Sequence, residues 1–173
     1  FTDNANNGAA DVYKDKNLPI YASNLCTEIM LPSDHNWSFV CVLSSINVLH
    51  YDKWKDTDAV ETMIYFLDAV ITEFLEKLEV YKNSDDRDDQ QTFLFMERAY
   101  NFSKENRALG MGVLGWHSLL QSKMLPFDSQ GSYDLNSEVF KNIKEHSNKA
   151  SRDLAEKFGE PELLKGYGRR NTT

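Results

Sequence analysis

The chain has 173 residues, of which 19 are Lys or Arg and 27 are Asp or Glu, so its formal net charge is −8 at pH 7. This length predicts a single domain. An acidic chain is repelled by polyphosphate backbones, which argues against a protein that coats nucleic acid. Hydrophobic residues make up 41% of the sequence, too large a share for an intrinsically disordered chain.

The sequence has two cysteines, Cys26 and Cys41, too few for a disulfide scaffold. Asp68 and Glu73 interrupt the longest apolar stretch, so no transmembrane helix is expected. The N-terminus has neither the basic start nor the apolar core of a signal peptide. We therefore expect a cytoplasmic protein without a membrane partner. Because the first residue is Phe1, we expect a chain that was processed or cut from a longer frame.

The first third of the chain predicts an irregular segment followed by two strands. Residues 1–19 are rich in Asn, Asp, Ala and Gly and are expected to be irregular. Ile20–Leu31 and Phe39–Leu49 look extended, and the second of them is rich in β-branched residues. Pro32 and several small polar residues form the connection between them.

The clearest helix is predicted over residues 58–81, where apolar side chains recur with the spacing of one helical face. Asp58 and Glu61 resemble a capping pair at its start. A polar loop over residues 83–91 then leads to a second helix, which is expected over Phe93–Arg107. This second helix is polar enough to be partly exposed.

A Gly-rich segment follows the second helix. Gly110, Gly112 and Gly115 match Gly-x-Gly-x-x-Gly, which binds dinucleotides when it forms the turn after a strand. A charged, helix-like stretch over residues 103–107 precedes it here, so dinucleotide binding is not favoured. Close packing of backbone in a barrel-like turn is the preferred interpretation. A short strand turning into a helix is expected over Val113–Ser122.

The last predicted element is a third helix, which starts at Asn136 or Ser137 and stops at Gly159. Strands that alternate with long helices favour an α/β architecture. Arg169 and Arg170 near the C-terminus could approach an anion, although a frayed basic terminus is the simpler interpretation.

No metal ligand is predicted in this chain. The four histidines lack His-x-x-x-His spacing, and the sequence has no Cys-x-x-Cys pair. The acidic run over residues 85–89 resembles the start of a calcium loop, but Gln91 stands where an EF-hand requires glycine. This run is therefore expected to be a solvated loop.

The richest chemistry lies in Ser23–Ile29. If this segment is a strand, Asn24, Cys26 and Glu28 share one face and place an amide, a thiol and a carboxylate along roughly 13 Å. A cysteine is unfavourable on an exposed face, which supports a catalytic role, while a solvent-exposed polar face is the structural alternative. Cys41, in the next predicted strand, is a redox thiol, a partner for Cys26, or a buried inert residue.

Taken together, five segments resemble the large, catalytic subunit of class I ribonucleotide reductases. Ser23–Ile29, which contains Asn-Leu-Cys-Thr-Glu, is similar to the active-site strand of that family, and Cys41–Asn47 to its second active-site cysteine segment. Glu105–Gly115 is similar to its Gly-rich barrel segment, and Gly168–Thr173 to the run before its Ser-rich phosphate loop. Phe1–Asn7 is similar to the stretch that leads into the cysteine strand. The resemblance spans essentially the whole chain and is closest to phage-type large subunits.

The resemblance implies part of a ten-stranded α/β barrel and specific roles for four residues. Cys26 would become a transient thiyl radical that abstracts the 3′ hydrogen of the ribose, and Glu28 would accept the 3′-hydroxyl proton. Asn24 would orient the sugar. Cys41 would belong to the cysteine pair that becomes a disulfide as the 2′-hydroxyl leaves as water. The substrate-binding residues would be Asn24, Leu25, Cys26, Thr27 and Glu28.

The family's catalytic chain is several times longer, so the resemblance implies a single partial domain over residues 1–173, incomplete at both ends and inactive alone. The partner of Cys41, the phosphate loop and the allosteric nucleotide sites would lie elsewhere. The expected partners are a ribonucleoside diphosphate, the remainder of the large subunit, a small subunit whose metal centre generates the radical, and thioredoxin or glutaredoxin as reductant. No cofactor is expected in this chain.

Two alternatives stay open at this point. One is an adenosylcobalamin-dependent reductase of the same superfamily, which shares the cysteine strand. The other is a non-catalytic helical interaction module, in which Cys26 and Cys41 are core residues and the helix over residues 58–81 binds a partner.

Overall fold

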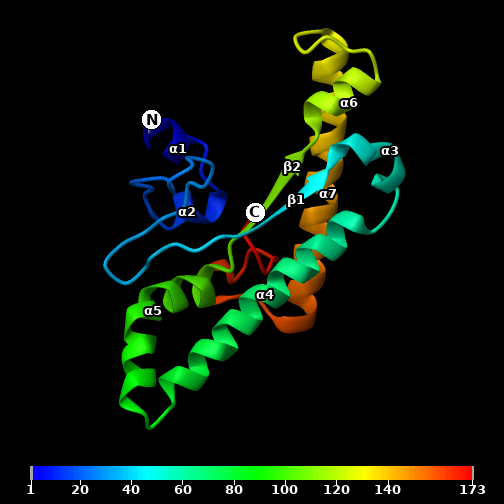
Figure 1. The fold of residues 1–173 in the computed structure, drawn as a ribbon. Coiled ribbons are helices and arrows are strands. Elements are labelled where there is room, and N and C mark those ends of the chain that lie inside the picture. Colours follow the sequence, from blue (N-terminus) through cyan, green and yellow to red (C-terminus); the bar gives the residue numbers. More distant parts are fainter. Residues whose placement is uncertain (1, 173) are drawn as a thin grey trace.

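The computed structural model describes residues 2–172 and contains a pair of parallel strands (Figure 1). β1 spans Val42–Asn47 and β2 spans Leu109–Leu114. Parallel strands need a long crossover connection, and here it is built from the helices α4 (Ala59–Lys82) and α5 (Arg87–Asn106), which pack against each other as a hairpin. The predicted α/β architecture is confirmed.

The remaining elements are short, except for one long helix near the C-terminus. In chain order they are α1 (Thr2–Asn7), α2 (Asp11–Asp15), the 3₁₀ turn η1 (Val48–His50), α3 (Tyr51–Trp54), α6 (Trp116–Ser122), α7 (Gln130–Phe158) and the 3₁₀ turn η2 (Glu162–Leu164). The N-terminal segment, predicted to be irregular, thus forms two short helices; Phe1 lies outside the described residues.

Helix α4 confirms the helix predicted over residues 58–81, because its apolar stripe is buried as the periodicity requires. The capping prediction at its start is wrong. Within the described part of the chain, Asp58 makes no side-chain cap hydrogen bond. Glu61 is instead buried, and its Oε1 lies 2.8 Å from Nδ1 of His146 on α7.

Helix α5 begins six residues before its predicted start at Phe93. The carboxylate of Asp86 accepts hydrogen bonds from the backbone N–H groups of Asp88 (2.7 Å) and Asp89 (3.3 Å), which caps the first turn. The acidic run that resembles a calcium loop therefore starts a helix. Its carboxylates interact favourably with the positive end of the helix dipole.

Helix α7 also begins earlier than predicted, at Gln130 instead of Asn136 or Ser137. Ser129 caps it by accepting a hydrogen bond from the N–H of Ser132 at 3.2 Å. The buried face of α7 carries serines at intervals, which conceals the apolar periodicity on which the prediction depended. These buried serines are Ser132, Ser147 and Ser151. The predicted stop at Gly159 is confirmed.

The two faces of the strand pair have different environments. On one face, Val42, Leu109 and Met111 pack with apolar side chains of α4 and α7. Ile46 and Val113 continue this contact toward α6 and η1. On the opposite face lie α1, α2 and the coil that precedes β1. This second face is where the candidate site forms.

Within residues 2–172, no helix is long and apolar enough to cross a membrane.

Candidate active site

A cavity of about 560 Å³ lies on the strand face that α4 and α7 leave uncovered. Cys41, Leu43, Gly110 and Gly112 line it from the strands. The opposite wall comes from α1, α2 and residues 28–31 of the coil. The cavity thus joins segments that lie far apart in the sequence.

The two glycines of the cavity lie inside β2. The register places Leu43 opposite Gly110 and Ser45 opposite Gly112, so all four residues belong to the same face. The prediction of a barrel-like turn at these glycines is therefore wrong, because the turn comes later, at Gly115, where φ is +80°. A dinucleotide fingerprint needs its first glycines in the loop after the strand, so this geometry does not provide one.

The predicted strand over Ile20–Leu31 is wrong, because none of these residues lies in a strand. Residues 24–29 instead form a closed loop, here called the cysteine loop. The Asn24 N–H donates to the Ile29 carbonyl at 3.2 Å, and the Ile29 N–H donates to the Asn24 side-chain oxygen at 3.0 Å. The Thr27 N–H donates to the Asn24 carbonyl at 3.2 Å. Thr27 has a φ of +69°, which a strand does not accommodate.

The cysteine loop separates side chains that the strand hypothesis placed on one face. Leu25 is 97% exposed at the tip, next to the exposed Cys26. Glu28 lies at the base of the loop and lines the cavity. Asn24 closes the loop with its side-chain oxygen. The predicted alignment of Asn24, Cys26 and Glu28 along about 13 Å of strand is therefore not observed.

Glu28 and Cys41 are the two predicted site residues that the structure brings into one cavity. Cys41 immediately precedes β1, close to its predicted place in a strand. Burial, and to a lesser degree the negative charge of Glu28, raise the pKa of the Cys41 thiol to about 11. The thiol is therefore protonated at neutral pH, which keeps it in the form of a hydrogen donor rather than a thiolate nucleophile.

Both cysteines are free thiols, Cys26 exposed and Cys41 half-buried. Within residues 2–172, no three His, Cys, Asp or Glu side chains gather closely enough to hold a metal ion.

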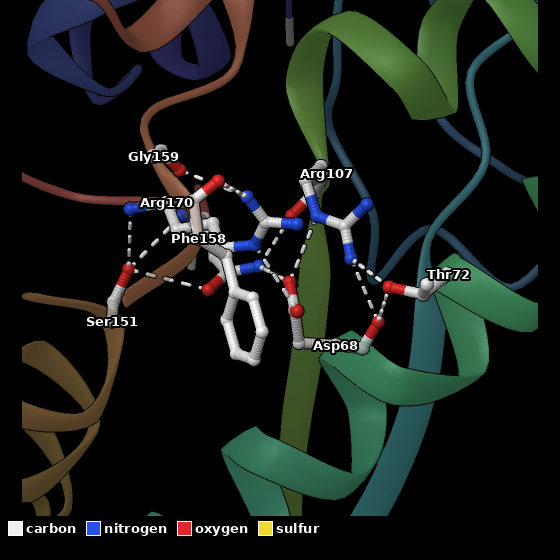
Figure 2. A network of polar contacts seen from close by, with 8 residues as sticks. Asp68, Thr72, Arg107, Ser151, Phe158, Gly159 and Arg170 are labelled. Atoms are coloured by element: carbon white, nitrogen blue, oxygen red, sulfur yellow. Dashed lines mark hydrogen bonds and ion pairs between the residues drawn. The ribbon is translucent and has the colours of Figure 1, made fainter. Parts of the chain in front are cut away.

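The sequence analysis missed a buried polar cluster beneath the strands, centred on Asp68 of α4. Arg107, which ends α5 in a left-handed conformation (φ +46°), donates from Nε to the Asp68 carboxylate at 2.8 Å. Its Nη2 donates to the Asp68 carbonyl at 2.8 Å and to the Thr72 hydroxyl at 2.7 Å. Arg170 reaches the second carboxylate oxygen of Asp68 from the other side at 3.2 Å (Figure 2).

The same cluster fixes the C-terminal segment. Asn171 donates to Asp68 at 2.8 Å, and its backbone N–H donates to the Ser151 hydroxyl at 2.9 Å. Arg170 donates through Nη1 to the carbonyls of Phe158 and Gly159 (Figure 2). The prediction of a frayed basic terminus is therefore wrong. We call Asp68, Thr72, Arg107, Ser151, Arg170 and Asn171 the Asp68 cluster.

Burial of Asp68 by itself would raise its pKa, but the hydrogen bond and charge of Arg107 outweigh burial and hold the pKa below its usual range. The sequence did contain a sign of this role. Asp68 shares the inward stripe of α4 with Ile64, Leu67 and Ile71, and a carboxylate on a buried face needs a cationic partner.

The cluster also positions the strand beside the cavity. The Leu109 N–H at the start of β2 donates to the Thr172 carbonyl at 2.9 Å, so the C-terminal segment runs along β2. The Thr172 hydroxyl accepts a hydrogen bond from the phenol of Tyr13 on α2 at 3.2 Å. Thr172 and Tyr13 both line the cavity. One buried ion cluster thereby connects α4, α7 and the cavity wall.

A thiol-bearing cavity on parallel strands agrees with the family resemblance, although the expected cysteine strand is a loop, and comparison with known proteins decides the family. Residues 1–171 match the family described as ribonucleotide reductase, barrel domain. The chain belongs to the ribonucleotide reductase family. This one match covers all but two residues of the sequence.

Individual relatives agree. A frog virus 3 protein assigned as a ribonucleoside-diphosphate reductase large subunit is 37% identical over 171 residues, which cover 99% of this chain and 28% of the viral protein. The ribonucleoside-diphosphate reductase large subunit of invertebrate iridescent virus 3 is 32% identical over 97% of this chain and 25% of its own length.

A solved structure is more similar still. The class Id ribonucleotide reductase alpha subunit of Actinobacillus ureae is 55% identical and superposes with a TM-score of 0.89. The match covers 100% of this chain and 31% of that subunit. The chain thus spans less than a third of the length of these relatives. The closeness to phage-type subunits stays a prediction.

Proposed function

We propose that this chain is the part of a ribonucleoside-diphosphate reductase large subunit that carries the radical cysteine, the general base and one cysteine of the reducing pair. The observation that carries the proposal is the shared cavity of Glu28 and Cys41, whose lining includes the end of the loop that holds Cys26. Family membership supports it, because the relatives are named as large subunits of this reductase.

The proposed chemistry converts a ribonucleoside diphosphate to its deoxy form. A thiyl radical on Cys26 abstracts the 3′ hydrogen, and Glu28 accepts the 3′-hydroxyl proton as the C2′–O bond breaks and water leaves. Cys41 and a second cysteine outside this chain supply two electrons and two protons and become a disulfide. The 3′ hydrogen then returns from Cys26, so the thiyl radical is regenerated and the atoms balance.

The geometry suits these roles in three ways. The exposed thiol of Cys26 stands at the tip of a loop, where a substrate sugar and a surrounding barrel wall can reach it. Glu28 faces the same cavity as the protonated Cys41 thiol. Asn24 uses its side-chain oxygen to close the loop, so its Nδ2 is the group we assign to the sugar. The backbone of Leu25 and Thr27 would follow the substrate.

Several partners belong to this proposal. The remaining two thirds of the subunit would supply the phosphate loop, the second reducing cysteine and the allosteric nucleotide sites. A metal-containing small subunit would generate the radical, and thioredoxin or glutaredoxin would reduce the disulfide. No cofactor is assigned to this chain.

The test uses the complete subunit together with its small subunit. We expect Cys26→Ser to abolish nucleotide reduction. We also expect it to abolish the release of the 3′ hydrogen from the substrate, while substrate binding stays unchanged. We expect Cys41→Ser to remove turnover driven by a dithiol reductant. Cys26→Ser with normal turnover would refute the proposal. A parallel loss of folding in both variants would instead favour a structural role for the cysteines.

The two alternatives are not favoured. The relatives are diphosphate reductases and a class Id subunit, which does not support the adenosylcobalamin-dependent class. A non-catalytic helical module does not explain an exposed Cys26 and a cavity shared by Glu28 and Cys41. Adenosylcobalamin dependence of the complete enzyme would reverse the first conclusion.

A further inference from the structure

The Cys41 thiol lies against a part of β2 that has no side chain. The register places Gly110 opposite Leu43, and a Cβ built on Gly110 would approach the Cys41 Sγ to 3.0 Å. Ordinary van der Waals contacts of a Cβ lie between 3.4 and 4 Å. The same Cβ would overlap the Leu43 side chain. The space beside the thiol therefore exists because residue 110 is glycine.

Backbone conformation does not explain this glycine. Gly110 lies within the regular strand β2, and the glycines with positive φ are Gly115, Gly159, Gly166 and Gly168. An alanine can adopt strand dihedrals without strain. Glycine inside a strand weakens it and often marks the close approach of another group. Here the approaching groups are the Cys41 sulfur and the Leu43 side chain.

The strand provides a matched neighbour for comparison. Gly112 is two residues further along β2 and belongs to the same face. A Cβ on Gly112 would meet the Ser45 hydroxyl at 3.0 Å and the Ser44 carbonyl at 3.7 Å. The Ser45 hydroxyl is thus as close to this Cβ as the Cys41 Sγ is to a Cβ on Gly110, but the overlap with Leu43 has no counterpart at Gly112, and the Cys41 sulfur is not among its neighbours. The two glycines differ in what they make room for.

We propose that Gly110 is a positioning residue for the reducing cysteine: its missing side chain lets the Cys41 sulfur lie against β2 at the base of the cavity, in the place from which it reaches the substrate and its partner cysteine. This inference rests on the proposed function of Cys41. A methyl group at position 110 displaces the sulfur by a few tenths of an ångström. Geometry-dependent steps respond steeply to such displacements.

The experiment compares three variants in the complete reductase. Gly110→Ala is expected to lower kcat about tenfold, with KM for the diphosphate substrate changed less than threefold. Gly112 lines the same cavity without approaching the sulfur, so Gly112→Ala serves as the comparison for the state of the Cys41 thiol. The double variant Leu43→Ala/Gly110→Ala removes the overlap with Leu43 and keeps the contact with Cys41. We expect it to stay as defective as Gly110→Ala.

A second measurement reports on the thiol itself. The rate at which iodoacetamide alkylates Cys41 in the reduced enzyme, followed by mass spectrometry, is expected to change at least about threefold in both Gly110 variants. Gly112→Ala should leave this rate unchanged. Thermal unfolding of the double variant shows whether the subunit is folded. If Gly110→Ala alone misfolds, kcat and the alkylation rate are measured on the double variant instead.

The outcomes separate the inference from the proposed function. Recovery of kcat in the double variant would show that Gly110 makes room for Leu43 alone, and would overturn the inference. A raised KM with unchanged kcat would assign Gly110 to the shape of the substrate cavity, which also overturns it. Normal turnover of Cys41→Ser with a dithiol reductant would instead refute the role of Cys41 and leave the packing of Gly110 as a structural fact.

Discussion

The Asp68 cluster and the cysteine loop hold polar groups by opposite means. Asp68 and Arg107 are each about 95% buried, and six side chains from four segments satisfy one another there. The cysteine loop is closed by three hydrogen bonds that all involve Asn24, and its tip is exposed. A buried charge tolerates no loss of a partner, whereas an exposed loop changes shape at small cost. We therefore expect the Asp68 cluster to be rigid and the cysteine loop to be adaptable.

The largest effect is expected where a buried charge loses its partner. Arg107→Met should lower the free energy of unfolding by about 3 kcal/mol, because Asp68 keeps only Arg170 as a cationic partner. Arg152→Met, on the exposed side of α7, is the control and should change it little. Urea unfolding measures both. Equal stability of the two variants would show that the cluster does not stabilise the fold.

The second prediction concerns acid. The folded-state pKa of Asp68 is depressed, so its stabilisation is complete above the unfolded-state pKa of about 4 and is lost as pH falls through the folded-state value. Asp68→Asn should therefore be less stable than the wild type at pH 7, and the gap should narrow below about pH 4. Urea midpoints from pH 7 to pH 3 test this. A gap that is constant with pH would exclude the ionised carboxylate as its cause.

A smaller, local effect is expected in the cysteine loop. Asn24→Ala removes the side-chain hydrogen bond to Ile29 and should cost about 1 kcal/mol. Hydrogen exchange at the Ile29 amide should accelerate by about fivefold, while exchange in α4 stays unchanged. Unchanged exchange at Ile29 would mean that the backbone hydrogen bonds hold the loop alone.

Thr27→Gly should raise the free energy of unfolding, whereas Asn24→Ala should lower it. Thr27 is β-branched and has a φ of +69°, a conformation that costs a non-glycine residue about 1 kcal/mol. Glycine removes this cost but gains entropy in the unfolded chain, so we expect a net stabilisation of about 0.5 kcal/mol. Slower exchange of the Ile29 amide would agree with this expectation, and faster exchange would contradict it.

The smallest effect is expected for an exposed ion pair on α4. Lys77 lies 2.7 Å from Glu73, and both side chains are more than half exposed. Water and salt screen such a pair, so Lys77→Ala should leave the urea midpoint unchanged within error. A clear loss would show that burial is not what distinguishes the Asp68 cluster.

Much of the fold follows from local pattern. The helix over Ala59–Lys82 agrees with the predicted span to within a residue at each end, and Gly159 ends α7 as expected. The apolar positions of a long helix recur many times within one segment, so a single polar residue on the buried face does not conceal the pattern. The start of α7 was missed because a serine, Ser132, occupies the buried face of its first turn.

For the candidate site, the sequence indicated the residues but not their local structure. Asn24, Cys26, Glu28 and Cys41 were singled out from their chemistry and from a family resemblance. The strand assigned to the first three was wrong, because period-2 alternation in a short polar segment does not distinguish a strand from a loop closed by one Asn side chain.

The sequence by itself determined the long helices and their order, the α/β class and the family, because these depend on residues that are close together in the chain or on motifs that are specific in combination. Tertiary structure alone decided that Glu28 shares a cavity with Cys41 and that Asp68 meets Arg170, 102 positions away. Such contacts depend on how separate segments pack, and a buried carboxylate finds its partners only when the chain has folded around it.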